Sequence, residues 1–401
     1  MNKQLITLAL VGLSTMPANA QINGDGYYRI QNAKSGRYMT LCDNHSDGID
    51  YSATQAETGA LETRGDKSNI ISDPGSIFYI KKISGNEYNI ISQGADMHSM
   101  TNYYIKIIES SYTKGAYRAY QTSKGYALYL ADKGFKDGIS YVTTSSDYKE
   151  YRDWYITPVS TETDNFIGIT PNIESDGKYF ASFYTGFAYD LASSGMKAYY
   201  ISNVDEKSGI AVYKEISGTI PAKTPVYIEC SSKDVADNKI KPLADNVAAI
   251  SGNKLTGVFF SVGNWRSGHY NSVQFDEKTM RTLNVEDGKL VYNTATDLLA
   301  TTEVCLKPGS NKNEDFANRT TIAHNTNYLS VANGTAASLK LLSEDEYKST
   351  GINDITIDTC NKPANIYNLN GTIVRKNATS TEGLAKGIYL FNGKKVRIFY
   401  K

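Results

Sequence analysis

The richest cluster of recognition chemistry in the sequence lies between residues 262 and 271. It holds Trp265, Arg266, His269 and Tyr270. Saccharides bind by stacking their C–H faces on aromatic rings while flat polar groups pair with the hydroxyls, so this composition suits a glycan. The alternative is a hairpin whose tryptophan folds back on its own sheet, a common arrangement for such a loop.

Signatures of catalysis are missing from the sequence. It has no G-x-S-x-G elbow, no H-E-x-x-H zinc motif and no glycine-rich phosphate loop. The four histidines stand singly, and the cysteines have no C-x-x-C spacing, so we expect no metal and no cofactor. Spacing does not test the paired carboxylates of a glycoside hydrolase, because the fold places them. We therefore assign no catalytic residue, and a hydrolase stays open.

Charge and length set the broad class. The 401 residues carry 42 basic and 42 acidic side chains, whereas nucleic-acid binding requires a basic excess, so we expect no nucleic-acid partner. The length fits two or three domains. The unusual feature is 31 tyrosines.

Residues 1–20 have the composition of a cleavable secretory signal. Lys3 precedes a short apolar run, and Ala18 and Ala20 occupy the small-residue positions before a cut at Gln21. The run is too short to span a bilayer, and we expect no transmembrane segment. We expect an exported protein, extracellular or on the outer-membrane surface, with the periplasm also open. Export would permit a disulfide between Cys230 and Cys305, although buried thiols are the commoner outcome.

The elements that must carry these residues are strands. Short runs alternate apolar and polar residues, as in 87–91 and 126–130, between clusters of Gly, Asn, Asp and Ser. Period two with aromatic and β-branched residues predicts strands and hairpins. We therefore predict an all-β protein with a β-trefoil-like N-terminal domain (21–160), a central β module (171–345) and a small β-sandwich-like C-terminal domain (352–401).

An internal repeat within residues 24–160 underlies the first domain. An aromatic-led strand occurs at 78–83, 103–107 and 154–159, and the hairpin pattern of 28–39 returns weakly at 117–128. These motifs resemble the ricin-B-like β-trefoil. The middle repeat is shorter than that family's. The polar stretch 160–165 follows as a linker, and we expect Trp154 in the core.

The trefoil resemblance implies sugar sites in its lobes. Lectins of this kind use an acid near the start of a lobe with an aromatic residue further on. Asp43 with Tyr51, and Asp132 with Tyr141, take these places, without the relatives' spacing. A solvated turn is the competing interpretation of the acidic stretch around Asp43.

Two further resemblances concern export. The order of motifs from 176 to 307, including Ile220–Ile228, is similar to an accessory β module of exported Bacteroides and Prevotella proteins. In the tail, Asn370-Gly371 and Asn392-Gly393 predict tight hairpins. This tail is similar to sorting domains of type IX secretion.

Together these features predict a secreted or cell-surface, non-catalytic binding protein. Its expected partner is a glycan or a glycoprotein of a host or cell surface. The alternatives are an exported hydrolase of glycans or peptides and an adhesin that recognises protein.

Overall fold

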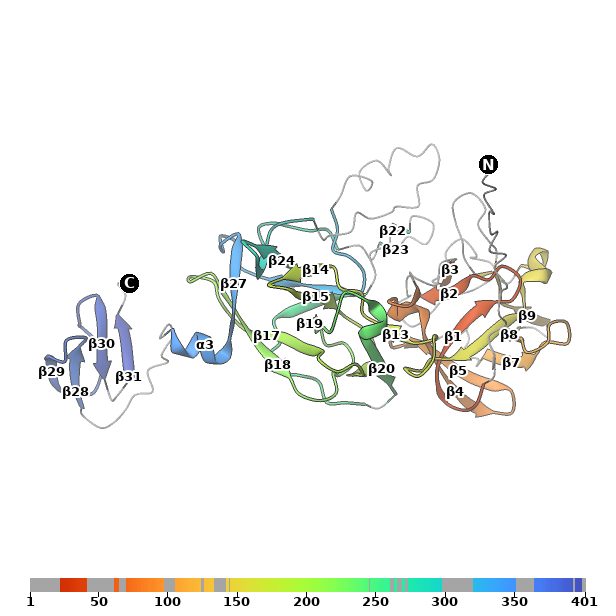
Figure 1. The fold of residues 1–401 in the computed structure, drawn as a ribbon, viewed down its shortest axis with the longest axis horizontal. Helices are drawn as coiled ribbons and strands as arrows, with labels where there is room; N and C mark the ends of the chain where they lie inside the picture. Colours follow the sequence, from red (N-terminus) through yellow and green to blue (C-terminus); the bar gives the residue numbers. More distant parts are fainter. Residues whose placement is uncertain are drawn as a thin grey trace, which may run out of the picture. The chain divides into compact units, whose positions relative to one another are not determined.

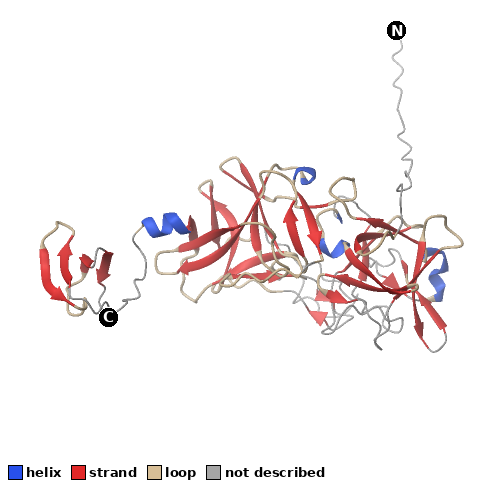
Figure 2. Cartoon of the chain, turned by 90° about the horizontal axis from the view of Figure 1, so that it is seen from below, coloured by secondary structure: helices blue, strands red, loops and turns tan. Residues whose placement is uncertain are grey.

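The chain is all-β, and the helices among its described residues are no longer than six residues (Figure 2). The computed structural model describes residues 22–41, 61–64, 70–96, 105–123, 126–132, 142–143, 145–244, 246–259, 263–264, 269–270, 273–297, 320–350, 364–391 and 394–398. It forms two compact units, Met1–Leu341 and Leu342–Lys401. The helical turns in the described residues are η2 (Pro74–Ser76), η3 (Ser146–Tyr151), η4 (Val235–Asp237) and α3 (Glu344–Ser349).

Six antiparallel strands at the start of the first unit close into a barrel (Figure 1). They are β1 (Gly26–Asn32), β4 (Phe78–Ser84), β5 (Glu87–Ser92), β7 (Ile105–Glu109), β8 (Tyr117–Ser123) and β12 (Trp154–Pro158). Each pairs with the next, and β12 returns to pair with β1. The closed ring leaves none of these six strands with a free edge.

Shorter strands lie off this ring. They are β2 (Tyr38–Leu41), β3 (Leu61–Arg64), β6 (Ala95–Asp96), β9 (Tyr126–Tyr129), β10 (Ala131–Asp132) and β11 (Val142–Thr143). Strands β2 and β3 pair with each other, as do β10 and β11. Three apolar side chains in or beside these shorter strands lie in the barrel core: Leu41, Leu130 and Val142.

The barrel core repeats the pattern found in the sequence. Strands β4, β7 and β12 each bury two alternate side chains: Phe78 and Ile80, Ile105 and Ile107, Trp154 and Ile156. Trp154 is 1% exposed, and its indole N–H donates to the Leu130 carbonyl at 3.0 Å. The prediction that Trp154 lies in the core is confirmed, because period-two alternation puts every second residue of each motif on one face.

The rest of the first unit contains a large twisted sheet and a smaller one. The large sheet has the order β14 (Ile173–Ser175), β15 (Lys178–Phe183), β19 (Val226–Cys230), β17 (Lys197–Asp205), β18 (Ile210–Ile216), β27 (Ser338–Ser343), β25 (Lys289–Asn293), β24 (Met280–Glu286), β26 (Thr326–Ser330) and β21 (Leu255–Val258). The smaller one has the order β13 (Ile167–Gly168), β20 (Lys239–Leu243) and β16 (Ala188–Leu191).

The middle strands of the large sheet are buried on both faces. On one face, Ala198 and Ile228 join a core that includes Tyr189 and Ile240 of the smaller sheet. On the other, Tyr199 and Tyr227 stack with ring centroids 5.0 Å apart in a second core. The motif at 220–228 of the predicted central module runs into strand β19.

A buried polar cluster joins the barrel to the rest of the first unit. The Gln93 side chain accepts hydrogen bonds from Gly186 N at 2.7 Å and Thr185 Oγ1 at 3.1 Å, and donates to Asn325 Oδ1 at 2.8 Å. Gly186 lies so close that a Cβ there would come within 2.2 Å of the Gln93 backbone. Only glycine permits this approach.

Buried Arg29 makes a second junction. Its Nη1 donates to Asn165 Oδ1 at 2.9 Å and to the Phe166 carbonyl at 2.6 Å, and Nε donates to Ser76. Asn165 in turn donates to the Pro158 carbonyl. The sequence predicts a linker at 160–165. This stretch instead forms a hydrogen-bonded turn, and its last residue, Asn165, is buried because it bonds to the Arg29 guanidinium.

The second unit opens with α3, capped by Ser343 and Glu346 in a reciprocal capping box. Its described strands form one four-stranded sheet, where the sequence predicts a sandwich-like domain. The order is β29 (Ile373–Ala378), β28 (Ala364–Asn368), β30 (Gly387–Phe391) and β31 (Lys394–Ile398). Both predicted hairpins are present, and Gly371 adopts the left-handed φ of +79° that its turn requires.

Within the part of the chain that the structure describes, no helix has the length and apolarity needed to cross a membrane.

Candidate functional site

The predicted glycan loop is only partly visible. Trp265 and Arg266 lie outside the described residues. His269 and Tyr270 form β23 (His269–Tyr270), which pairs with β22 (Gly263–Asn264) in a short antiparallel hairpin. The backbone therefore agrees with the predicted hairpin, and the binding role of its side chains stays a prediction.

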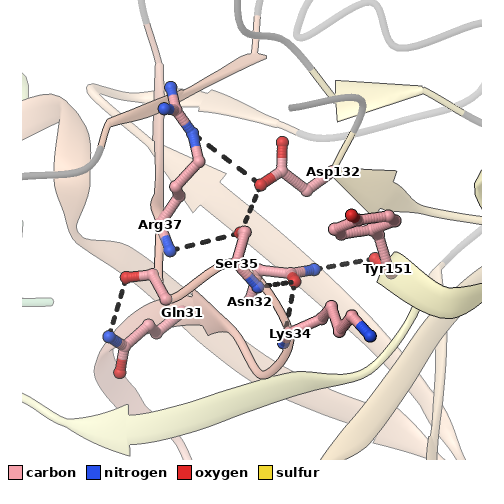
Figure 3. Close-up of polar contacts among 8 residues, drawn as sticks. Gln31, Asn32, Lys34, Ser35, Arg37, Asp132 and Tyr151 are labelled. Atoms are coloured by element: carbon pink, nitrogen blue, oxygen red, sulfur yellow. Dashed lines mark hydrogen bonds and ion pairs between the residues drawn. The ribbon is translucent and has the colours of Figure 1, made fainter. Parts of the chain in front are cut away.

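Of the two acids predicted to bind sugar, Asp43 and Asp132, the structure describes only Asp132. Asp43 lies outside the described residues, as do Tyr51 and Tyr141. Asp132 is 0% exposed, accepts a 2.5 Å hydrogen bond from Ser35 Oγ and lies 3.8 Å from Arg37 Nε (Figure 3). A carboxylate so enclosed fastens β10 to the turn between β1 and β2, and it does not fit the exposed sugar ligand that the sequence predicts.

The turn that meets Asp132 is held by its own side chains. Asn32 Oδ1 accepts hydrogen bonds from the backbone N–H groups of Lys34 and Ser35, and Asn32 Nδ2 donates to the Tyr151 carbonyl at 2.7 Å (Figure 3). These bonds hold the turn of the motif at 28–39 in place, which gives its asparagine and serine a structural role.

A better candidate is an open cleft of about 370 Å³ beside the barrel, where β1 and β4 meet β20. Tyr27 and Tyr79 are cross-strand partners in β1 and β4. Their neighbours Tyr28 and Phe78 point into the barrel core, so alternation turns Tyr27 and Tyr79 outward. The cleft is lined by Asp25, Gly26, Tyr27, Tyr79, Val159, Ser160, Thr161, Ile240, Lys241, Pro242, Leu243 and Ala244.

The two tyrosines have different roles in the cleft. Tyr27 packs against Phe187 with ring centroids 5.5 Å apart and donates its hydroxyl to the Leu243 carbonyl at 3.0 Å. Burial raises the pKa of the Tyr27 phenol well above its ordinary value, and Tyr79 adds to the shift. The Tyr27 side chain is thus held in place and uncharged, and it forms one side of the cleft. Tyr79 lies 5.2 Å from it, tilted by 50°, and is half-buried.

Charged groups of both signs border these rings. Asp25 Oδ1 accepts the Lys82 backbone N–H at 2.8 Å, and Oδ2 has no hydrogen-bond partner among the described residues. Lys241 is exposed, and its ammonium group likewise has no partner in the described part of the chain. Aromatic faces beside an acceptor and a donor can hold a sugar ring by stacking and hydroxyl pairing.

The cleft is not evident from the sequence. Tyr79 falls in the predicted strand at 78–83, and the alternation that buries Phe78 and Ile80 is the one signal that places Tyr79 on the outer face. Lys241 had no such signal, because it meets the tyrosines only after β20 packs beside the barrel.

Metal or thiol chemistry finds no support in the described residues. They contain no group of three His, Cys, Asp or Glu side chains placed to hold a metal ion. Cys230 is a buried free thiol, and burial, with a contribution from Glu229, raises its pKa to about 12. A thiol with that pKa is unreactive at neutral pH.

Comparison with known proteins finds no protein family that matches the chain, and no curated protein matches it.

Proposed function

We propose that this chain is an exported, non-catalytic glycan-binding protein whose site is the tyrosine-lined cleft. The observation that carries the proposal is the pairing of Tyr79 with the fixed wall of Tyr27, beside Asp25 and Lys241. The open cleft suits one or two sugar rings of a longer glycan. A single stacked ring with few hydrogen bonds gives weak affinity, so binding at a surface would depend on several copies.

The barrel supports the assignment of the first domain to the ricin-B-like trefoils. Six strands close a ring, pairs β2–β3 and β10–β11 lie off it, and the buried pairs of β4, β7 and β12 repeat. Export rests on the composition of residues 1–20 and on the similarity of the tail to sorting domains. Location at the cell surface follows as part of the same proposal.

Glycan binding can be tested with the exported chain on a glycan array, followed by calorimetry with the strongest ligand. Tyr79→Ala should lower the affinity at least about tenfold, because removal of a stacking ring costs on the order of 1–3 kcal/mol. The matched control is Tyr155→Ala. Tyr155 is a half-buried tyrosine of the same barrel that does not line the cleft.

Two other results would redirect the proposal. If Trp265→Ala abolishes binding and Tyr79→Ala does not, the loop at 262–271 is the site, as the sequence predicts. If the bound glycan is hydrolysed, the hydrolase alternative replaces the binding protein. The absence of any saccharide binding at millimolar concentration would refute the proposal.

The adhesin alternative has one observation in its favour. In the second unit, Ile373 and Leu390 are both cross-strand partners of Tyr367, so the three lie in one row on one sheet face. Ile373 is 40% exposed and Leu390 37%, and Ile366 and Phe391 fill the core on the other face. An exposed apolar row of this kind suits a protein partner. Ile373→Lys should abolish attachment to a surface protein if this alternative is correct.

A further inference from the structure

A second polar site lies on the barrel at Arg118, away from the cleft residues. The Arg118 Nε donates to Asp153 Oδ1 at 2.6 Å, and Asp153 Oδ2 accepts from Thr113 Oγ1 at 2.5 Å. Burial acts to raise the pKa of Asp153, but hydrogen bonds from Thr113, Arg118 and Ser110 hold it below its ordinary value. The carboxylate therefore stays charged and fixes the guanidinium, whose Nη1 and Nη2 bond to no other described residue.

Aromatic rings flank this guanidinium. The Arg118 Cζ lies 4.3 Å from the ring centroid of Tyr112 and 5.7 Å from that of Tyr129. The Tyr112 side chain is 78% exposed, the highest value among the exposed large hydrophobic and aromatic residues that the structure describes. An exposed aromatic ring held in place by a fixed cation is a ready stacking platform, because little side-chain entropy is left to lose on binding.

A second arginine, Arg152, contacts the Tyr129 ring. The Arg152 Cζ lies 5.3 Å from the Tyr129 centroid, and the buried Arg152 Nε has no hydrogen-bond partner among the described residues. Burial and the nearby charge of Arg118 lower the pKa of Arg152. Arg118 pairs with Asp153, whereas Arg152 Nη2 donates to the Ser145 carbonyl at 3.4 Å. The nearby Glu150 is 3.5 Å from Lys34, with which it forms an exposed ion pair.

We propose that Arg118, Arg152 and Tyr112 form a subsite for an anionic saccharide, one bearing a carboxylate or a sulfate group. The anion would accept hydrogen bonds from Arg118 Nη1 and Nη2 and from Arg152 Nη1, and the sugar ring would pack on Tyr112. Arginine suits planar oxyanions because its N–H groups form a rigid fork. This inference rests on the proposed glycan binding and names the class of glycan.

Calorimetry on the full exported chain tests the subsite with matched pairs of ligands. The pairs are trigalacturonate with its methyl ester, sialyllactose with lactose, and a sulfated heparin disaccharide with its desulfated form. The acidic member of at least one pair should bind at least about tenfold more tightly than the neutral member. A preference in either of the first two pairs would indicate recognition of a carboxylate, and a preference in the third would indicate recognition of a sulfate.

Single substitutions test whether the acidic ligand binds at Arg152 and Tyr112. Arg152→Gln and Tyr112→Ala should each lower the affinity for the acidic ligand about tenfold or more, and Tyr112, being exposed, can be replaced without loss of fold. Lys149→Gln removes the same charge from an exposed neighbouring position and should change the affinity little. Binding of neutral glycans at the cleft should be unchanged in all three variants.

The outcomes separate the two proposals. Neutral binding that depends on Tyr79, without a preference for the acidic ligands, would overturn the subsite and leave the proposed function intact. Acidic binding that depends on Arg152, without any effect of Tyr79→Ala, would support the subsite and refute the cleft. Equal effects of Arg152→Gln and Lys149→Gln would overturn the subsite, and an absence of all binding would overturn both.

Discussion

Replacing Gly186 by alanine should loosen the junction between the barrel and the remainder of the first unit. The new Cβ would lie 2.2 Å from the Gln93 carbonyl carbon and 2.3 Å from its oxygen, whereas ordinary contact begins at 3.4 Å. Backbone atoms cannot rotate away as a side chain can. The two segments must therefore move apart by roughly 1 Å, enough to break the 2.7 Å hydrogen bond from Gly186 N to Gln93.

The cost follows from the same contacts. Overpacking of this kind costs about 1–3 kcal/mol, and each buried hydrogen bond that is lost adds about 1 kcal/mol or more. We expect Gly186→Ala to lower the free energy of unfolding by about 3–5 kcal/mol. Thr185→Val, which removes only the 3.1 Å bond to Gln93, should cost about 1 kcal/mol.

Urea unfolding followed by circular dichroism measures both effects. Gly26→Ala is the matched control, because its Cβ would meet nothing closer than 3.7 Å. If Gly186→Ala unfolds at the same urea concentration as Gly26→Ala, the close packing of Gly186 on Gln93 does not join the barrel to the rest of the first unit.

Three further predictions concern stability and reactivity. Burial raises the pKa of Tyr27, Tyr28, Tyr184, Tyr189, Tyr199, Tyr227 and Tyr292 above the ordinary 10.0, so their contribution to stability is complete below pH 10 and is lost as the pH rises above it. The share of the tyrosinate absorbance that comes from these seven of the 31 tyrosines should therefore appear only together with loss of the circular dichroism signal, and complete ionisation of all the tyrosines before unfolding would contradict this. Arg29→Met should cost about 3 kcal/mol or more in urea unfolding, because it leaves Asn165 Oδ1 and the Phe166 carbonyl without their donor; a loss below 1 kcal/mol would show that water replaces it. With Cys42, Cys305 and Cys360 changed to serine, Cys230 should react with a thiol reagent only after unfolding, and rapid reaction of the native protein would show that it is accessible.

The fold class could be predicted from the sequence because alternation is a local property. The motif of Trp154 and Ile156 recurs at Phe78 and Ile80, and each pair is buried for the same reason. Tight turns are equally local: Asn370-Gly371 specifies its hairpin without help from the rest of the chain.

The candidate site could not be predicted, because its parts come from distant segments. Tyr79 follows Tyr27 by about fifty residues and Lys241 follows much later, and only the barrel pairing and the packing of β20 bring them together. Burial is likewise a property of the whole fold. Asp132 has the residue type of a sugar ligand, and its enclosure by Ser35 and Arg37 depends on a contact with the distant turn between β1 and β2.

A crystal structure of the chain with its strongest array ligand would show directly where the saccharide binds. We expect a sugar ring against Tyr79, with hydroxyls that pair with Asp25 and Lys241 in the cleft beside the barrel. A saccharide bound at the loop that carries Trp265, with the Tyr79 cleft free of ligand, would contradict this expectation.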